Sequence, residues 1–182
     1  KKSKEQVLLV ISPKDEFPDQ LLKNLRFDGH TRIIQASLGP AYSRKTKNSY
    51  TIREKQEDYA KLFQDFKDQT ITKIVFYSPG QETKTAQTRK EKEKGIMNLF
   101  YLAKSCFQNQ ADPVSELVLL APFAHKVTEQ EKTIFPANTA LAGLGKAVMM
   151  ENPGLKCRVI DIDQKTDAPQ IAQEITSDHS DS

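Results

Sequence analysis

The sequence predicts an α/β fold of three layers, in which helices cover both faces of a mostly parallel sheet. Five short apolar runs of strand length are separated by segments whose apolar residues recur at helical spacing. The runs are continuously apolar rather than alternating, as expected for strands buried on both faces. Strict alternation of strand and helix is typical of right-handed crossovers in a doubly wound sheet.

Five strands are expected along the chain. They are Val7–Ile11, a strand within Thr31–Ala36 around Ile33 and Ile34, Ile74–Tyr77, Leu117–Leu120 and Val159–Ile162. Each run is followed by a helical segment, so the sheet should carry helices on both of its faces.

Five helices are expected, each with one apolar face that packs on the sheet. The first two are marked by Phe17, Leu21, Leu22 and Leu25, and by Tyr59, Leu62, Phe63 and Phe66. The third is marked by Ile96, Phe100, Ala103 and Phe107, with Met97 and Leu99 widening the stripe. The last two are marked by Ala140, Leu141, Leu144, Ala147 and Val148, and by Ala168, Ile171, Ala172 and Ile175. The third helix should end near Gln108, and 109–113 should form a turn-rich connection.

Length and composition point to one domain. A chain of 182 residues suits a single sizeable core, so we expect a domain over 1–176 and a polar tail over 177–182 that frays. The 27 basic and 24 acidic residues give a net charge of only +3, which argues against nucleic-acid binding. No apolar run approaches the ~18 residues of a membrane span. No signal segment opens the chain, so we expect a cytoplasmic location.

The two cysteines, Cys106 and Cys157, lie far apart on a predicted helix and a predicted strand. Their spacing fits neither a metal site nor a disulfide framework. We therefore expect reduced, buried thiols and no metal.

The turn after the first strand lacks the residues that bind a dinucleotide. Such turns carry Gly-x-Gly-x-x-Gly, because the backbone must approach the pyrophosphate at the start of a helix. Here the turn runs from Ser12 to Phe17, with no glycine and with two carboxylates, Asp15 and Glu16. The only Gly-x-Gly, Gly143-Leu144-Gly145, lies inside the fourth helix, where we expect close packing on the sheet or on another helix.

Other catalytic patterns are missing too. None of the five tyrosines is followed four residues later by the lysine or asparagine that a reductase tyrosine needs. The three histidines, His30, His125 and His179, are isolated, and His125 alone follows a predicted strand. Asp161 and Asp163 resemble a paired-carboxylate site, but strand-end solvation or capping of the next helix explains them better. We therefore expect no catalytic, cofactor-binding or metal-binding residue in this chain.

Two adjoining stretches resemble one protein family. Ala140–Pro153, with Gly-Leu-Gly-Lys and Glu-Asn-Pro, is followed by Cys157–Asp163, which ends in Val-Ile-Asp-Ile-Asp. This unit resembles the ketoreductase region of modular polyketide synthases, and specifically its structural, N-terminal subdomain. The order of predicted elements agrees over most of the chain. Ala142 stands where the family often has an aromatic residue, and Lys146 where it often has arginine.

The resemblance implies a truncated Rossmann-like fold, similar to short-chain dehydrogenases, without catalytic function of its own. NADPH would bind to a following catalytic subdomain, which would reduce β-ketoacyl chains carried on the phosphopantetheine arm of an acyl carrier protein. The implied partners are that catalytic subdomain, the neighbouring synthase domains and, indirectly, the carrier protein. Neither nucleic acid nor a membrane is among them.

Two other functions stay open at this point. The chain could be an interaction module of a synthase without an active ketoreductase attached, or a divergent stand-alone short-chain oxidoreductase. Binding of NADPH by this chain would favour the oxidoreductase. The sequence that follows Ser182 in the parent polypeptide would separate the other two.

Overall fold

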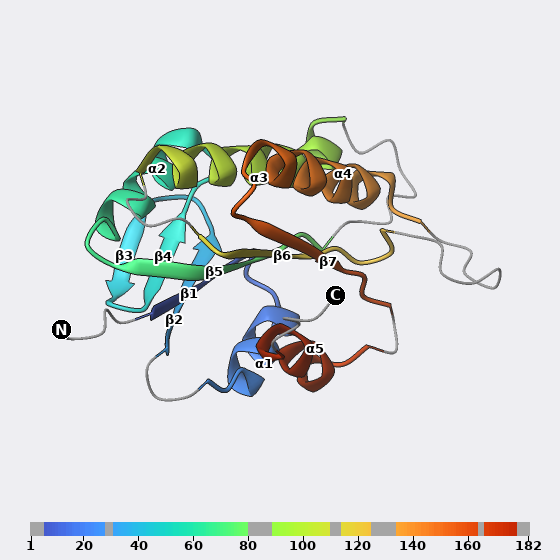
Figure 1. The fold of residues 1–182 in the computed structure, drawn as a ribbon, viewed down its shortest axis with the longest axis horizontal. Coiled ribbons are helices and arrows are strands. Elements are labelled where there is room, and N and C mark those ends of the chain that lie inside the picture. Colours follow the sequence, from blue (N-terminus) through green and yellow to red (C-terminus); the bar gives the residue numbers. More distant parts are fainter. Residues whose placement is uncertain are drawn as a thin grey trace.

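A seven-stranded sheet lies between two layers of helices (Figure 1). The structure is a computed structural model that describes residues 6–27, 31–79, 89–109, 114–124, 134–163 and 166–177, with the backbone alone at 89–92 and 109. Helices α1 (Glu16–Asn24) and α5 (Ala168–Thr176) cover one face. Helices α2 (Gln56–Asp65), α3 (Arg89–Asn109) and α4 (Pro136–Glu151) cover the other. None of the described helices is long and apolar enough to span a membrane.

The strand order is β3-β4-β2-β1-β5-β6-β7, and only β3 runs antiparallel to its neighbour. The bounds are β1 Gln6–Ser12, β2 Thr31–Leu38, β3 Ser43–Thr46, β4 Ser49–Ile52, β5 Thr70–Tyr77, β6 Glu116–Leu120 and β7 Lys156–Ile160. The predicted parallel sheet is confirmed. The last strand ends earlier than predicted, so Asp161 and Ile162 lie beyond it.

Strand β1 contributes side chains to two separate apolar cores. Val7, Leu9 and Ile11 pack under α2, α3 and α4, whereas Leu8 and Val10 pack under α1 and α5. All five side chains are at most 1% exposed. Because successive side chains of a strand point to opposite faces, a strand between two helical layers must be apolar throughout. This explains the continuous apolar run in the sequence.

The connection between the parallel strands β2 and β4 contains the short strand β3 and no helix, and neither β3 nor β4 was predicted. Residues 39–42 lead from β2 to β3, and a turn at Lys47 and Asn48 leads back into β4. Gly39 donates its N–H to the carbonyl of Ile52 at 2.9 Å, and a Cβ on Gly39 would lie 2.5 Å from Thr51 Cγ2. The expectation of strict strand and helix alternation is therefore wrong here, and the fold is truncated at this edge.

A charged network ties the end of α5 to the sheet. Lys73 of β5 and Arg158 of β7 both contact the carboxylate of Glu116 of β6, at 2.8 and 3.0 Å. Lys73 Nζ also donates to the carbonyl of Ile175 at 2.6 Å, and Arg158 Nη1 donates to that of Glu174 at 2.9 Å. Cations thus satisfy carbonyls in the last turn of the helix, which have no intrahelical partner.

The loop after β6 is held from several sides. Phe123 has a φ of 53°, which is uncommon for a bulky residue, and its ring lies 5.1 Å from that of Phe135. Asn138 Nδ2 donates to the carbonyl of Pro122 at 2.6 Å, and Ala124 N–H donates to Asp161 at 3.1 Å. These contacts fix the backbone at the start of α4.

Candidate functional site

The carboxyl ends of β1 and β5 are the place where a doubly wound sheet binds its ligand, because the strand order reverses there. β1 ends at Ser12, and β5 ends at Tyr77. The chain leaves β1 through the turn that precedes α1.

The amino end of α1 is capped by a carboxylate of the chain itself. Asp15 is the N-cap residue, and its Oδ1 accepts a hydrogen bond from the N–H of Glu16 at 2.7 Å. Glu16 and Asp19 add two further negative charges in the first turn. A helix amino end attracts anions through its unpaired N–H groups and its dipole. Here carboxylates of the chain itself occupy this amino end, where a dinucleotide-binding turn would place phosphate.

Two aromatic rings fill the space beside this turn. Phe17 of α1 and Tyr77 of β5 have ring centroids 5.1 Å apart, and Tyr77 is 8% exposed. Burial, together with the nearby charge of Asp15, raises the pKa of Tyr77 to about 12. A pyrophosphate at this position would meet carboxylates and packed rings instead of glycine N–H groups. The residues present do not fit a nicotinamide dinucleotide here.

Three further tyrosines are poor acid–base groups. Burial raises the pKa of Tyr50 and Tyr59, and it raises that of Tyr42 together with the hydrogen bond from Tyr42 to Asp65. A tyrosine that exchanges protons with a substrate needs its pKa lowered towards neutrality. These shifts have the opposite sign.

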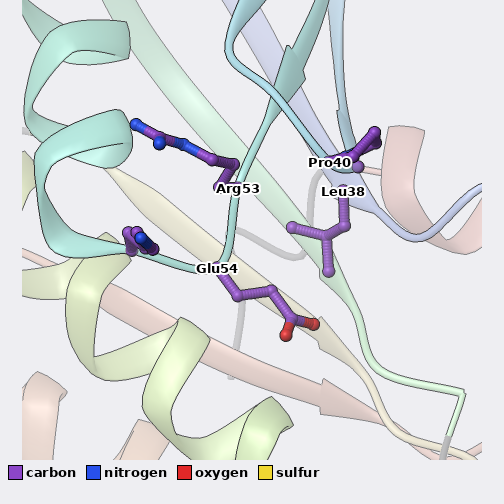
Figure 2. A pocket seen from close by; sticks show the side chains of 6 residues that line it. Leu38, Pro40, Arg53 and Glu54 are labelled. Atoms are coloured by element: carbon purple, nitrogen blue, oxygen red, sulfur yellow. The ribbon is translucent and has the colours of Figure 1, made fainter.

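A hollow of about 610 Å³ lies at the carboxyl ends of β2 and β4 (Figure 2). It is lined by Leu38, Gly39, Pro40, Arg53, Glu54 and Lys55. The guanidinium of Arg53 points away from Leu38 and Pro40, and it binds both carboxylate oxygens of Asp58, at 2.6 and 3.0 Å. Glu54 lies 3.7 Å from Lys94 of α3. The charges of Arg53 and Glu54 are thus already paired within the chain.

A second hollow lies on the α1 side of β2 and β4, where the connection without a helix leaves the sheet uncovered. Its lining includes Asp15, Asp19, Gln35, Ser37 and Thr51. The other lining residues are also polar or charged, with Tyr50 as the one aromatic side chain among them. Ligand sites are mostly apolar with a few polar groups, so this hollow lacks the usual character of a ligand site.

The two carboxylates singled out in the sequence each bind a backbone N–H. Asp161 binds the N–H of Ala124, and Asp163 binds the N–H of Thr166 at 2.8 Å, so neither caps α5. The cap of that helix is Asp167, which accepts from Gln170 N–H at 3.0 Å. Of the two roles expected for Asp161 and Asp163, strand-end solvation and helix capping, the capping role is therefore wrong. All three histidines lie outside the described residues.

Metal and thiol chemistry have no site in the described part of the chain. No group of three histidine, cysteine, aspartate or glutamate side chains there could hold a metal ion. Cys106 is buried and Cys157 is half-buried, and both are free thiols. Burial raises their pKa values to about 12 and about 11, respectively, which disfavours the reactive thiolate.

The outer side of α3 is apolar, contrary to the predicted orientation of this helix. Leu99, Leu102 and Cys106 face the sheet, whereas Phe100 and Phe107 are 48% and 41% exposed. Phe100 and Phe107 were expected to pack on the sheet, and that expectation is wrong. The helix carries apolar residues on two sides, so spacing alone selected the wrong one.

The two glycines of α4 face opposite ways. A Cβ on Gly145 would lie 2.5 Å from Leu119 Cδ1 and 2.9 Å from Cys157 Sγ, so the expected close packing on the sheet is confirmed for this glycine. A Cβ on Gly143 would meet nothing within 4 Å. Ala140 and Ala147, expected on the packed side, are exposed. The outer side of α4 is therefore a flat strip of small residues.

Comparison with known families decides the identity of this fold. The family model described as "Beta-ketoacyl synthase-like, N-terminal" matches residues 6–178. The chain belongs to this family. Its members are the structural subdomains of ketoreductases, so the resemblance seen in the sequence is confirmed. No curated protein matches the chain.

Several solved structures share this fold. A keto acid-selecting nonribosomal peptide synthetase module with adenylation, ketoreductase and pseudo-Asub parts matches at a TM-score of 0.74 and 19% identity, over 96% of this chain and 15% of that one. An N-terminal ketoreductase from the macrolactin assembly line matches at a TM-score of 0.73 and 18% identity, over 95% of this chain and 37% of that one. An enoyl-[acyl-carrier-protein] reductase (NADH) from Aquifex aeolicus VF5 matches at a TM-score of 0.73 and 12% identity, over 94% of this chain and 87% of that one.

These likenesses show a Rossmann-like fold similar to short-chain dehydrogenases, as predicted. This family member spans only 15% and 37% of the two ketoreductase-containing chains.

Proposed function

We propose that this chain is the noncatalytic structural subdomain of a polyketide synthase ketoreductase. In this role it stabilises and orients a catalytic subdomain of the same polypeptide. That subdomain would bind NADPH and reduce β-ketoacyl chains on an acyl carrier protein. Family membership supports the assignment to the ketoreductase region.

One observation carries the noncatalytic role. The carboxylate of Asp15 caps α1 at the position where a dinucleotide-binding turn places phosphate. The packed rings of Phe17 and Tyr77 take up the adjoining space. Cofactor chemistry must then come from another part of the ketoreductase, and what this chain contributes is a folded body with a surface for that part.

A titration of NADPH by calorimetry tests this proposal. We expect no heat beyond dilution with residues 1–182. We expect saturable binding near one equivalent with the natural polypeptide that contains them. An independent readout is thermal unfolding, because a ligand at 100 times its Kd stabilises the native state by about 2.7 kcal/mol. Saturable binding to residues 1–182 alone would overturn the proposal and favour a divergent oxidoreductase.

A further inference from the structure

One edge of the sheet carries a concentration of positive charge. Residues 31–53, which include β2, β3 and β4, contain five arginine and lysine residues and neither aspartate nor glutamate. Because the net charge of the whole chain is only +3, the rest of the chain is net negative. The positive charge is thus gathered at one place, and such a field attracts partners of opposite sign.

Three of these cations lie on the outermost hairpin of the sheet. Arg44 and Lys45 belong to β3, Lys47 lies in the turn to β4, and all three are exposed. No ion pair among the described residues involves any of them. We use the name basic edge for these three residues together with Lys61 of α2. Unlike Arg53, which is paired within the chain, the hairpin cations are available to a partner.

Two tyrosine rings hold the cations on the α2 side in place. The Cζ atom of Arg44 lies 5.6 Å from the ring centroid of Tyr50, and the Nζ atom of Lys61 lies 4.3 Å from that of Tyr42. The two ring centroids are 6.5 Å apart. The neighbouring carboxylate of Asp65 already accepts a hydrogen bond from the Tyr42 hydroxyl at 2.9 Å. A cation that rests on a ring loses less conformational freedom when a partner binds.

Basic side chains lie on both sides of this edge, because successive residues of a strand point to opposite faces. Arg44 points to the α2 side, where Tyr50 lies opposite it on β4. Lys45 lines the second hollow, on the α1 side. Carboxylates at the start of α1 line that hollow too and offset part of its charge. A partner that meets Arg44 and Lys45 at once must run along the edge itself.

The outer side of β3 is open to such a partner. β3 pairs with β4 on one side, and among the described elements none pairs with its other side (Figure 1). An edge strand presents N–H and C=O groups to which another strand can add. A second copy of β3 is a poor occupant, because like charges directly opposite each other destabilise a strand pair. An acidic strand meets the same geometry with favourable charge.

We infer that β3 binds an extended acidic peptide, which adds to the sheet as a further strand. Acidic side chains on one face of the peptide meet Arg44 and Lys61, and those on its other face meet Lys45. Because β3 has only four residues and its cations are exposed, the complex is weak and sensitive to salt. The inference uses the charge and the open edge alone, so it does not depend on the proposed function.

Fluorescence anisotropy with a synthetic peptide tests this inference on residues 1–182. The probe is a fluorescein-labelled peptide of about eight residues in which threonine and glutamate alternate. We expect saturable binding at about 50 mM salt and an affinity at least about fivefold weaker at about 500 mM, because salt screens exposed charges. A peptide with lysine in place of glutamate should not bind. A peptide with proline in place of two threonines keeps the charge but loses N–H donors, and it should bind at least about fivefold more weakly.

Charge reversals in the chain locate the peptide. Arg44→Glu should weaken binding at least about fivefold, and Lys45→Glu at least about threefold, since carboxylates already share its side. Lys104→Glu is the matched control, because Lys104 is an exposed lysine on α3, and it should change the affinity less than about twofold. The double variant R44E/K45E should bind the lysine peptide that the unchanged chain rejects. This exchange of preference excludes misfolding as the cause.

Several results would overturn the inference. Absence of saturable binding at low salt would remove the site. Equal affinity for the proline peptide would leave attraction between charges without an added strand, and an effect of Arg44→Glu without one of Lys45→Glu would indicate a helix docked on the α2 side. Tighter binding to phosphatidylglycerol vesicles than to the peptide would make a lipid surface the occupant. A dimer in light scattering that Arg44→Glu dissociates would make it a second copy.

Discussion

Gly145 of α4 lies so close to Leu119 of β6 that a Cβ on the glycine would be 2.5 Å from Leu119 Cδ1. Leu119 is fully buried, and Cys157 Sγ closes the space from the next strand. The spacing between α4 and the sheet therefore depends on the missing side chain.

Gly145→Ala should destabilise the chain, whereas Gly143→Ala should not. Forcing a methyl group into a packed core costs about 1–3 kcal/mol, against about 1 kcal/mol gained in helix propensity. At Gly143 only the gain applies, because nothing lies within 4 Å. Urea unfolding of the two variants checks this, and equal midpoints would contradict it.

Glu116→Gln should cost about 2–4 kcal/mol of unfolding free energy, because it leaves two mostly buried cations without their shared carboxylate. Lys73 and Arg158 are 15% and 20% exposed. Glu54→Gln is the control, since its contact with Lys94 is longer and more exposed and should contribute under about 1 kcal/mol. Denaturant midpoints that shift alike in both variants would rule out a special role for the network.

Asp58→Asn should destabilise the chain at neutral pH and much less in acid. Hydrogen bonds from Arg53 hold the pKa of the Asp58 carboxyl below its usual value of about 3.9. A carboxyl whose pKa is lower in the folded state stabilises it above the unfolded pKa, and this stabilisation is lost as the pH falls through the folded pKa. The difference in unfolding free energy between Asp58→Asn and the unchanged chain should be largest above about pH 5 and shrink below about pH 4. A difference in unfolding free energy that does not change with pH would mean that lost packing, and not the lost charge, destabilises the variant.

Both thiols should resist alkylation at pH 8 in the folded chain. Burial raises the pKa of Cys106 to about 12 and that of Cys157 to about 11, so little thiolate is present. Ellman's reagent should detect two fast thiols only after denaturation. Cys106 should be the slower of the two in the native state, because Cys157 is less buried. Fast native reaction of Cys106 would show that α3 opens from the sheet.

The sequence was sufficient for the parallel sheet and its two helical layers, because the apolar runs of β1, β5 and β6 are long and continuous. It was insufficient for β3, whose four residues are all polar and exposed, and for β4, whose four residues alternate between polar and apolar. The pairing of β4 with β2 and with β3 depends on how the chain folds back after β2, and no local sequence pattern encodes that path.

The orientations of α3 and α4 were harder to predict for a physical reason. Both helices are apolar on the side that packs on the sheet and on the side that faces outward. Hydrophobic spacing does not say which of two apolar sides of a helix packs on the sheet, so Phe100 and Phe107 were assigned to the core. The ionic network of Lys73, Glu116 and Arg158 could not be predicted from the sequence either, because it joins three strands whose register only the folded sheet defines.

The Asp15 cap has a consequence for protein engineering. Inserting a glycine motif after β1 would not by itself give this chain a cofactor, because the carboxylate at the helix end would still repel phosphate. The rings of Phe17 and Tyr77 would still occupy the volume beside it, and removing them would open a hole in the core beneath α1 and α5. Three defects would have to be repaired together, and each single repair would lower stability before any affinity appeared. Attempts to evolve binding one substitution at a time should therefore stall at this sheet edge.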